Sequence, residues 1–279
     1  MDAAERTQGS VNDGPAHDTP GAVRAPSAFL LAAEQRAVLE LGAFFAASPL
    51  LRMAGRGDRH PVLVLPGFTA GDRSTAPLRW FLRSQGWWAH GWHLGPNFGP
   101  TRRIVTGMQE RLDELQGLHG RAVSIVGWSL GGIYARELAR RNPTTVRQVI
   151  TLGSPFRMVD GDRSWASGAY ESLAPAHRAE LLRIAAKEED REPVPVPTTA
   201  IYSRTDGIVR WHTCIDAVSP RHENVEVRGS HSGLGHNPTV LAVIADRLAQ
   251  PEGRWRPFKP PPWAALWYPK PADWVPRAS

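Results

Sequence analysis

The chain has 279 residues, 42% hydrophobic and 22% charged, which is long enough to bury one sizeable core and leads us to expect one catalytic-sized domain. Its formal net charge is +6, yet lysine occurs only at positions 187, 259 and 270, and the arginines are scattered among acidic residues. Because there is no basic block and no nucleic-acid motif, the charge indicates a solvated surface and no nucleic-acid partner.

The single cysteine, Cys214, excludes an intramolecular disulfide and a zinc site built from cysteines. The first residues, "MDAAERTQGSVNDGPAHDTPG", are acidic and polar, with no basic start followed by an apolar stretch, so we expect no secretory signal peptide. No stretch reaches the ~18 apolar residues of a membrane span. These features lead us to expect a cytoplasmic protein.

The amino-terminal part divides into two segments. Residues 1–26 have the polar, Gly- and Pro-rich composition of a disordered arm. Residues 27–57 read as an amphipathic helical segment, because apolar residues recur at spacings of seven, three and four on one helix face. These residues are Leu31, Val38, Leu41 and Phe45. We interpret the segment as a helix packed on the main domain; weak contact with a membrane surface is the less favoured alternative, because the opposite face is not strongly basic.

Strand and helix patterns alternate over residues 58–250. Short apolar runs predict strands at 61–65, 87–92, 122–126, 146–152, 198–203 and 224–228. Helical spacing predicts helices around 76–86, 105–115, 130–141 and 240–248. Alternation with buried strands predicts an α/β fold with a mostly parallel central sheet that helices cover on both faces.

Two segments break this alternation. Residues 155–195 contain a helical pattern around 174–187 and a charged, Pro-rich stretch, and we interpret them as a small helical lid. Residues 251–279 form a Pro- and Trp-rich tail that we expect to lack regular structure. Its tryptophan rings are expected to pack back on the domain, since proline makes an extended strap at low entropic cost. The alternative is that these rings enter a lipid interface.

The stretch Gly127-Trp128-Ser129-Leu130-Gly131 joins a predicted strand to a predicted helix. Glycine on both sides of Ser129 permits a sharp turn that pushes the serine hydroxyl out at the carboxyl edge of the sheet. This is the Gly-x-Ser-x-Gly pattern of a nucleophile elbow, and Trp128 beside the serine indicates an apolar wall.

A serine hydroxyl needs a base, and the base needs an orienting acid. Asp206 follows the strand at 198–203, and His231 follows the strand at 224–228, in the order serine, acid, histidine that such sites use. Asp160 is the alternative acid and His236 the alternative base. His90 and His93 flank a Gly-Trp pair, but no carboxylate completes a ligand set, so we assign them a role at a strand end and expect no metal.

Five motifs between about residues 60 and 250 resemble those of α/β-hydrolases of the lipase and esterase type. They are "VLVLPGFTAG", "GWSLGG", "TLGSPF", "SRTDGIV" and "GSHSGLGHNP". The resemblance implies that Ser129 is the nucleophile, His231 the general base and Asp206 its orienter. It also implies an oxyanion hole made by the backbone N–H groups of Phe68 and Leu130, with no cofactor. Many lipases have histidine at the position of Pro66. This difference argues against triglyceride hydrolysis more than against ester hydrolysis in general.

The favoured function is therefore a serine hydrolase that cleaves a small-molecule or lipid carboxylic ester through an acyl-enzyme. An acyltransferase or thioesterase would use the same residues, because the pocket selects the acceptor. A catalytically silent binding module on a hydrolase fold is the third hypothesis. An intact serine, acid and histidine set argues against that third hypothesis.

Overall fold

The fold is built on a parallel sheet of six strands in the order β2-β1-β3-β4-β5-β6. We use a computed structural model, which describes residues 24–158, 162–168, 172 and 191–273. The strands are β1 (Pro61–Leu65), β2 (Trp88–Gly91), β3 (Val123–Trp128), β4 (Val146–Leu152), β5 (Thr198–Ser203) and β6 (His222–Val227). The predicted α/β class and parallel sheet are confirmed.

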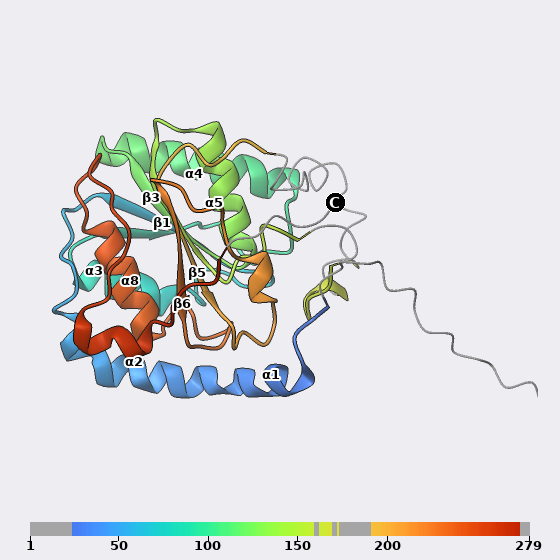
Figure 1. Ribbon diagram of the computed structural model, residues 1–279. Coiled ribbons are helices and arrows are strands. Elements are labelled where there is room, and N and C mark those ends of the chain that lie inside the picture. Colours follow the sequence, from blue (N-terminus) through green and yellow to red (C-terminus); the bar gives the residue numbers. More distant parts are fainter. Residues whose placement is uncertain (1–23, 159–161, 169–171, 173–190, 274–279) are drawn as a thin grey trace, which may run out of the picture.

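Helices cover both faces of this sheet (Figure 1). Their bounds are α1 (Ala28–Ala32), η1 (Ala33–Arg36), α2 (Ala37–Leu51), α3 (Ala76–Ser84), α4 (Arg102–His119), α5 (Leu130–Arg141), η4 (Trp211–Thr213), α8 (Pro238–Leu248) and η5 (Pro262–Trp267). One hydrophobic core joins α2, α3 and α8 to one face, and a second joins α4 and α5 to the other. Every residue of β1, β3, β4 and β5 is buried, which explains why apolar residues occur on both faces of these strands instead of alternating strictly with polar ones.

Strand β6 begins two residues before its predicted start at 224. Its first residues are polar, so no apolar run marks them, yet the whole strand is buried. Their polar groups find partners: Glu223 accepts a hydrogen bond from Thr199 at 2.9 Å and pairs with Arg247 at 2.9 Å. Partnered polar side chains therefore extend this strand where hydrophobicity alone would end it.

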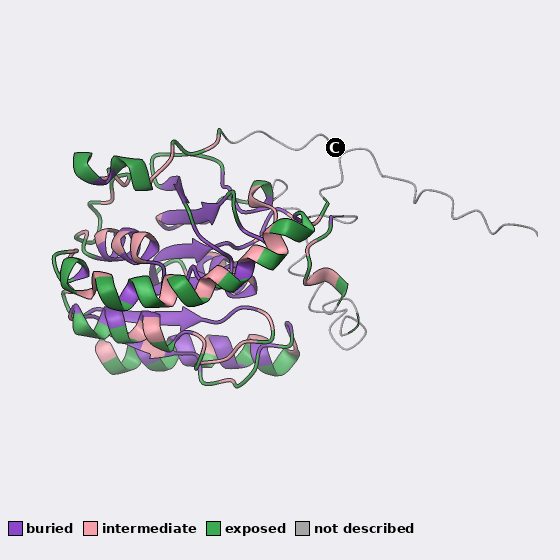
Figure 2. Ribbon diagram, turned by 90° about the horizontal axis from the view of Figure 1, so that it is seen from below, coloured by how far each residue is buried: buried purple, intermediate pink, exposed green. Residues whose placement is uncertain are grey.

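Residues 28–51 are helical, as predicted for the segment at 27–57, but the apolar face assigned to this segment is wrong. The 3₁₀ turn η1 separates α1 from α2, and a 3₁₀ turn advances by fewer residues than an α-helical turn. Within α2 the buried side is also not the predicted one, because Val38 and Phe45 are 74% and 62% exposed, whereas Phe44 and Leu51 are buried. Figure 2 shows exposed residues along the outer side of this segment.

The carboxyl-terminal tail departs from its prediction in two ways. It contains the short 3₁₀ helix η5, and Trp263 and Trp267 are 78% and 60% exposed instead of packing on the domain. Trp255 is half-buried as predicted, with the Arg247 guanidinium 6.0 Å from its ring, and Trp274 lies outside the described residues. Phe258 and Tyr268 do pack against the core beside α8.

Several sequence predictions fall partly or wholly beyond the described residues. The arm at 1–26 is described only from residue 24, and most of the predicted lid at 155–195, including Asp160, lies outside the described ranges. In the part of the chain that the structure describes, no helix combines the length and apolar character needed to cross a membrane.

Candidate active site

Ser129 stands between the end of β3 and the start of α5 in a strained backbone conformation, with φ 53° and ψ −122°. The turn is possible because its glycines have no side chain. A Cβ on Gly127 would lie 2.4 Å from the Gly131 carbonyl oxygen, and one on Gly131 would lie 2.5 Å from the Leu65 carbonyl oxygen. Strain held by such packing is typical of a functional turn.

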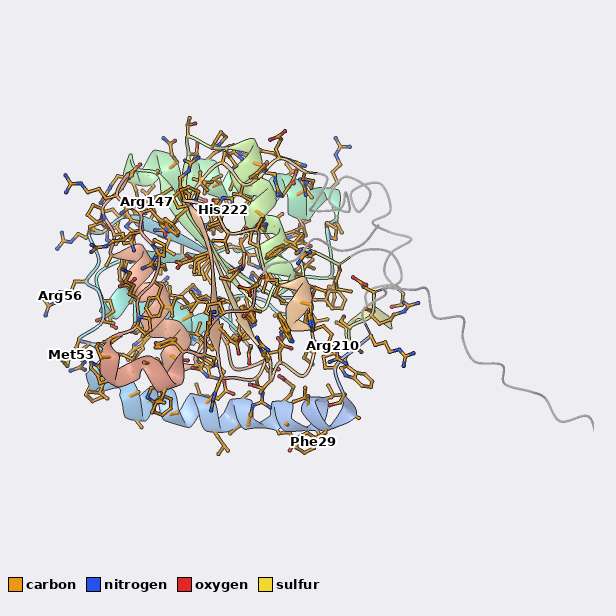
Figure 3. The ribbon with its side chains drawn as sticks, in the orientation of Figure 1. Phe29, Met53, Arg56, Arg147, Arg210 and His222 are labelled. Carbon is orange, nitrogen blue, oxygen red and sulfur yellow. The ribbon has the colours of Figure 1, made fainter. Side chains whose placement is uncertain are left out.

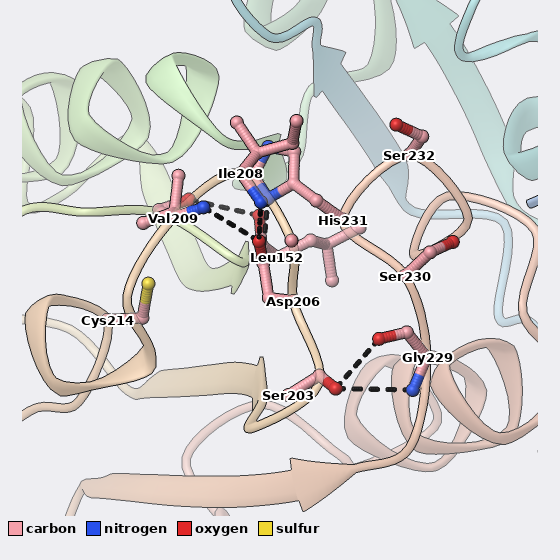
Figure 4. A network of polar contacts seen from close by, with 12 residues as sticks. Leu152, Ser203, Asp206, Ile208, Val209, Cys214, Gly229, Ser230, His231 and Ser232 are labelled. Carbon is pink, nitrogen blue, oxygen red and sulfur yellow. Dashed lines mark hydrogen bonds and ion pairs between the residues drawn. The ribbon is translucent and has the colours of Figure 1, made fainter. Parts of the chain in front are cut away.

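Asp206 and His231 form a buried pair just beyond β5 and β6 (Figure 4). The Asp206 Oδ2 atom lies 2.6 Å from His231 Nδ1. Its other oxygen, Oδ1, accepts hydrogen bonds from the backbone N–H groups of Ile208 and Val209, both at 2.8 Å. The carboxylate is therefore fixed in place while it orients the imidazole.

The end of β4 links the serine to this pair. The Ser129 N–H donates to the Leu152 carbonyl at 2.8 Å, and Gly153 follows directly. A Cβ on Gly153 would lie 3.0 Å from His231 Nδ1 and 3.1 Å from Asp206 Oδ2. The structure thus brings the three predicted residues to one edge of the sheet, around Gly153 of the "TLGSPF" motif.

Two further hydrogen bonds hold the loops that carry these residues. The indole N–H of Trp128 donates to the His231 carbonyl at 3.1 Å, which joins the elbow to the histidine loop. The Ser203 hydroxyl donates to the Gly229 carbonyl at 2.8 Å, which ties the end of β5 to the loop after β6 (Figure 4).

The electrostatic surroundings raise the pKa of His231. Burial alone lowers the pKa of this imidazole, but the charge of Asp206, its hydrogen bond and the charge of Glu34 act in the opposite sense, and the net result is a raised pKa. Such an environment stabilises the imidazolium that forms when a base takes a proton.

The predicted oxyanion loop passes directly beside the serine. A Cβ on Gly67 would lie 3.1 Å from the Ser129 Cβ atom. Buried Asn97 holds this loop: its side-chain N–H donates to the Pro66 carbonyl at 3.0 Å, and its backbone carbonyl accepts from the Thr69 N–H at 2.7 Å. Asn97 carries no motif in the sequence, so only the structure assigns it this role.

The alternative residues lie in different surroundings. His236 Nε2 is 2.9 Å from the Ala37 carbonyl, so this ring contacts α2. His90 pairs with His119, with 3.0 Å between their Nε2 atoms, and not with His93. Across the described ranges, no group of three or more His, Cys, Asp or Glu side chains is arranged to hold a metal.

A second serine, histidine and aspartate set lies at the opposite, amino-terminal end of the sheet. His60 Nε2 is 2.9 Å from the Ser124 hydroxyl, and its Nδ1 contacts Asp58. Both His60 and Ser124 are 0% exposed, so a substrate has no access to this hydroxyl. The set links the starts of β1 and β3 and is structural.

Comparison with known proteins identifies the fold. No family model and no curated protein matches the sequence. The chain is similar to Aspergillus fumigatus lipase B, with 17% identity and a TM-score of 0.50 over 71% of this chain and 54% of that one. It therefore spans about half the length of that lipase.

Two other similar structures have TM-scores below 0.5. Bacillus licheniformis lipase BlEst2 is 15% identical, with a TM-score of 0.49 over 70% of this chain and 94% of its own. Mouse α/β hydrolase domain-containing protein 10 is 17% identical, with a TM-score of 0.46 over 69% and 90%. Identities this low show the fold alone, and this chain has the α/β-hydrolase fold.

Proposed function

We propose that the protein is a serine hydrolase that cleaves a carboxylic ester through an acyl-enzyme. The observation that carries this proposal is the buried hydrogen-bonded pair of His231 and Asp206, which meets the strained Ser129 turn at the end of β4. The similar fold of Aspergillus fumigatus lipase B supports the same class of reaction.

In the proposed reaction, Asp206 holds Nδ1 of His231, which leaves Nε2 to accept the hydroxyl proton of Ser129. The serine oxygen attacks the ester carbonyl, and the electron pair of the carbonyl moves onto its oxygen. Backbone N–H groups of Phe68 and Leu130 are our candidates to stabilise this oxyanion, since the Phe68 loop passes beside the serine. The intermediate collapses as His231 gives the proton to the leaving alcohol.

The acyl-enzyme is then released by water, with His231 again acting as the base. Transfer to another acceptor, or the use of a thioester, would need the same residues and would differ only in the acceptor and leaving group. A small-molecule or lipid ester is the substrate class that we propose.

Substitution of Ser129 tests the proposal. We expect Ser129→Ala to lower hydrolysis of short-chain p-nitrophenyl esters by about four orders of magnitude or more, since the serine forms the acyl bond. Its circular dichroism spectrum and Tm should stay near those of the wild type. Rates are to be measured on purified protein at neutral pH.

Ser124→Ala is the matched control, because it removes a hydroxyl from the second, buried set. This variant should keep its esterase activity while losing some stability. Activity retained in Ser129→Ala would overturn the assignment of the nucleophile. A folded wild type with no esterase or acyl-transfer activity would favour the silent binding module.

A further inference from the structure

The amino-terminal segment reaches the candidate active site through Glu34. This carboxylate, in η1, is buried and accepts three backbone hydrogen bonds from the loops that carry the acid and the base. Its Oε1 atom accepts from Gly207 at 2.8 Å and from His231 at 2.9 Å. Its Oε2 atom accepts from Ser232 at 2.9 Å. One side chain therefore binds the residue after Asp206, the base itself and the residue after the base.

Two neighbouring charged residues fasten the same segment to the domain. Glu40 accepts hydrogen bonds from the Ser230 N–H at 2.8 Å and from the Asn237 side chain at 3.1 Å. Arg36 donates to the Gly229 carbonyl at 3.0 Å. These contacts hold the start and the end of the histidine loop, whereas the contacts of Glu34 reach the residues of the pair.

Glycines in the two loops make room for this approach. A Cβ on Gly207 would lie 2.2 Å from the Leu30 carbonyl oxygen, and one on Gly233 would lie 2.0 Å from a Glu40 carboxylate oxygen. These loops therefore fit the segment sterically as well as through hydrogen bonds.

Glu34 is charged in this position. Burial raises the pKa of its carboxyl, but the hydrogen bonds from Ser232, His231 and Gly207 lower it, and the net pKa lies below the usual value. A carboxylate that satisfies three backbone donors stabilises their loops more strongly than a neutral acceptor does.

We propose that Glu34 is a positioning residue of the active site, which holds the Asp206 and His231 loops in the arrangement that catalysis needs. This inference rests on the proposed serine hydrolase function. The segment formed by α1, η1 and α2 would then take part in catalysis indirectly. The Glu34 carboxylate of this segment fixes the backbone of the loop that carries the His231 imidazole. Displacement of a catalytic group by about 1 Å can cost 10²-fold in rate.

The test compares Glu34→Gln with the matched control Glu40→Gln. Glutamine keeps the size of the side chain but removes the charge and places an amide donor toward one of the backbone donors. For Glu34→Gln we expect kcat to fall about 10- to 100-fold with little change in KM. For Glu40→Gln we expect a similar loss of Tm and a smaller fall in kcat. Glu34→Asp keeps the charge and should restore part of the rate.

The pH profile separates positioning from general stabilisation. Several charged or titratable groups lie around His231 and its loop. They are its acid partner Asp206, Cys214 beside that carboxylate, Glu34, Arg36 and Glu40 from the amino-terminal segment, and His236 in the same loop. Loss of the negative charge of Glu34 destabilises the imidazolium, so the pKa of His231 falls. The acid limb of kcat/KM in Glu34→Gln should therefore shift to lower pH, whereas Glu40→Gln should keep the wild-type midpoint.

NMR titration of the His231 imidazole compares the two variants without catalytic turnover. The pKa of His231 should be lower in Glu34→Gln than in the wild type, and unchanged in Glu40→Gln. If Glu34→Gln matches Glu40→Gln in kcat, in the acid limb and in this titration, the positioning role is overturned and only a structural role remains. If the wild type instead shows no reaction that depends on Ser129, the proposed function fails, and the inference fails with it.

Discussion

His60 lies fully buried at the amino-terminal end of the sheet, between Asp58 and Ser124. Burial and the charge of Arg147 lower the pKa of this imidazole to about 4, and contact with Asp58 only partly opposes them. His60 is therefore neutral in the folded protein across the range in which an ordinary histidine, with a pKa of 6.5, takes up a proton.

This difference predicts a loss of stability on acidification. Between pH 6.5 and about 4 the unfolded chain binds a proton at His60 that the folded chain does not, so the free energy of unfolding falls as the pH falls through this window. Its contribution is at most about 3 kcal/mol. Urea unfolding at several pH values between 7 and 4 measures it, and His60→Gln should show a shallower decline than the wild type. Parallel declines would assign the effect to other groups.

The sequence predicted the residues whose chemistry is local. Ser129 sits in a five-residue pattern, and Asp206 and His231 follow strands that the sequence also reveals. Glu34 and Asn97 were not predicted, because each acts through hydrogen bonds to backbone groups that are distant in the chain. The sequence around Glu34 and Asn97 contains no motif, because only the folded chain brings their hydrogen-bond partners close to them.

At the scale of elements, the strand-turn-helix unit of β3, Ser129 and α5 depends on close backbone contacts. Gly131 packs against the backbone of Leu65 and Pro66, where a Cβ would lie 2.5 Å and 2.8 Å from their carbonyl oxygens. Because these neighbours are backbone atoms, they have little freedom to move away.

We therefore expect Gly131→Ala to lower the free energy of unfolding by about 1–3 kcal/mol and to impair activity. Gly117→Ala is the matched control, since Gly117 is an exposed position of α4 with nothing within 4 Å of its built Cβ. That change should stabilise the protein by about 0.5–1 kcal/mol. Urea unfolding of both variants measures the contrast, and equal effects would show that the elbow tolerates a side chain.

The elements were predicted best where hydrophobicity alone determines them. The bounds of β1, β4, β5 and α5 agree with their predicted ranges, because their apolar residues recur with the spacing of a strand or a helix and turn residues such as Asn142-Pro143 mark their ends. The buried face of the amino-terminal helix was predicted wrongly, since apolar side chains occur on more than one side of α2, and Val38 and Phe45 are exposed while Phe44 is buried. The tail failed because its proline content hid a single short 3₁₀ helix.

At the scale of the molecule, the amino-terminal segment has two different sides. Its acidic residues Glu34 and Glu40 face inward to the active-site loops. Its outer surface carries large apolar side chains, among them Phe29 and Met53, which are 79% and 83% exposed (Figure 3). Weak contact of this surface with a membrane stays a prediction.

The central claim is that Ser129, His231 and Asp206 act together as a catalytic triad. Labelling with a fluorophosphonate, followed by peptide mapping, tests it most directly, because the reagent phosphonylates a serine that a base activates much faster than an ordinary hydroxyl. We predict one adduct, on Ser129, in the wild type, with its formation slowed severely in His231→Ala and nearly unchanged in His236→Ala. Absence of the adduct, its location on another residue, or the opposite order of the two histidine variants would contradict the account.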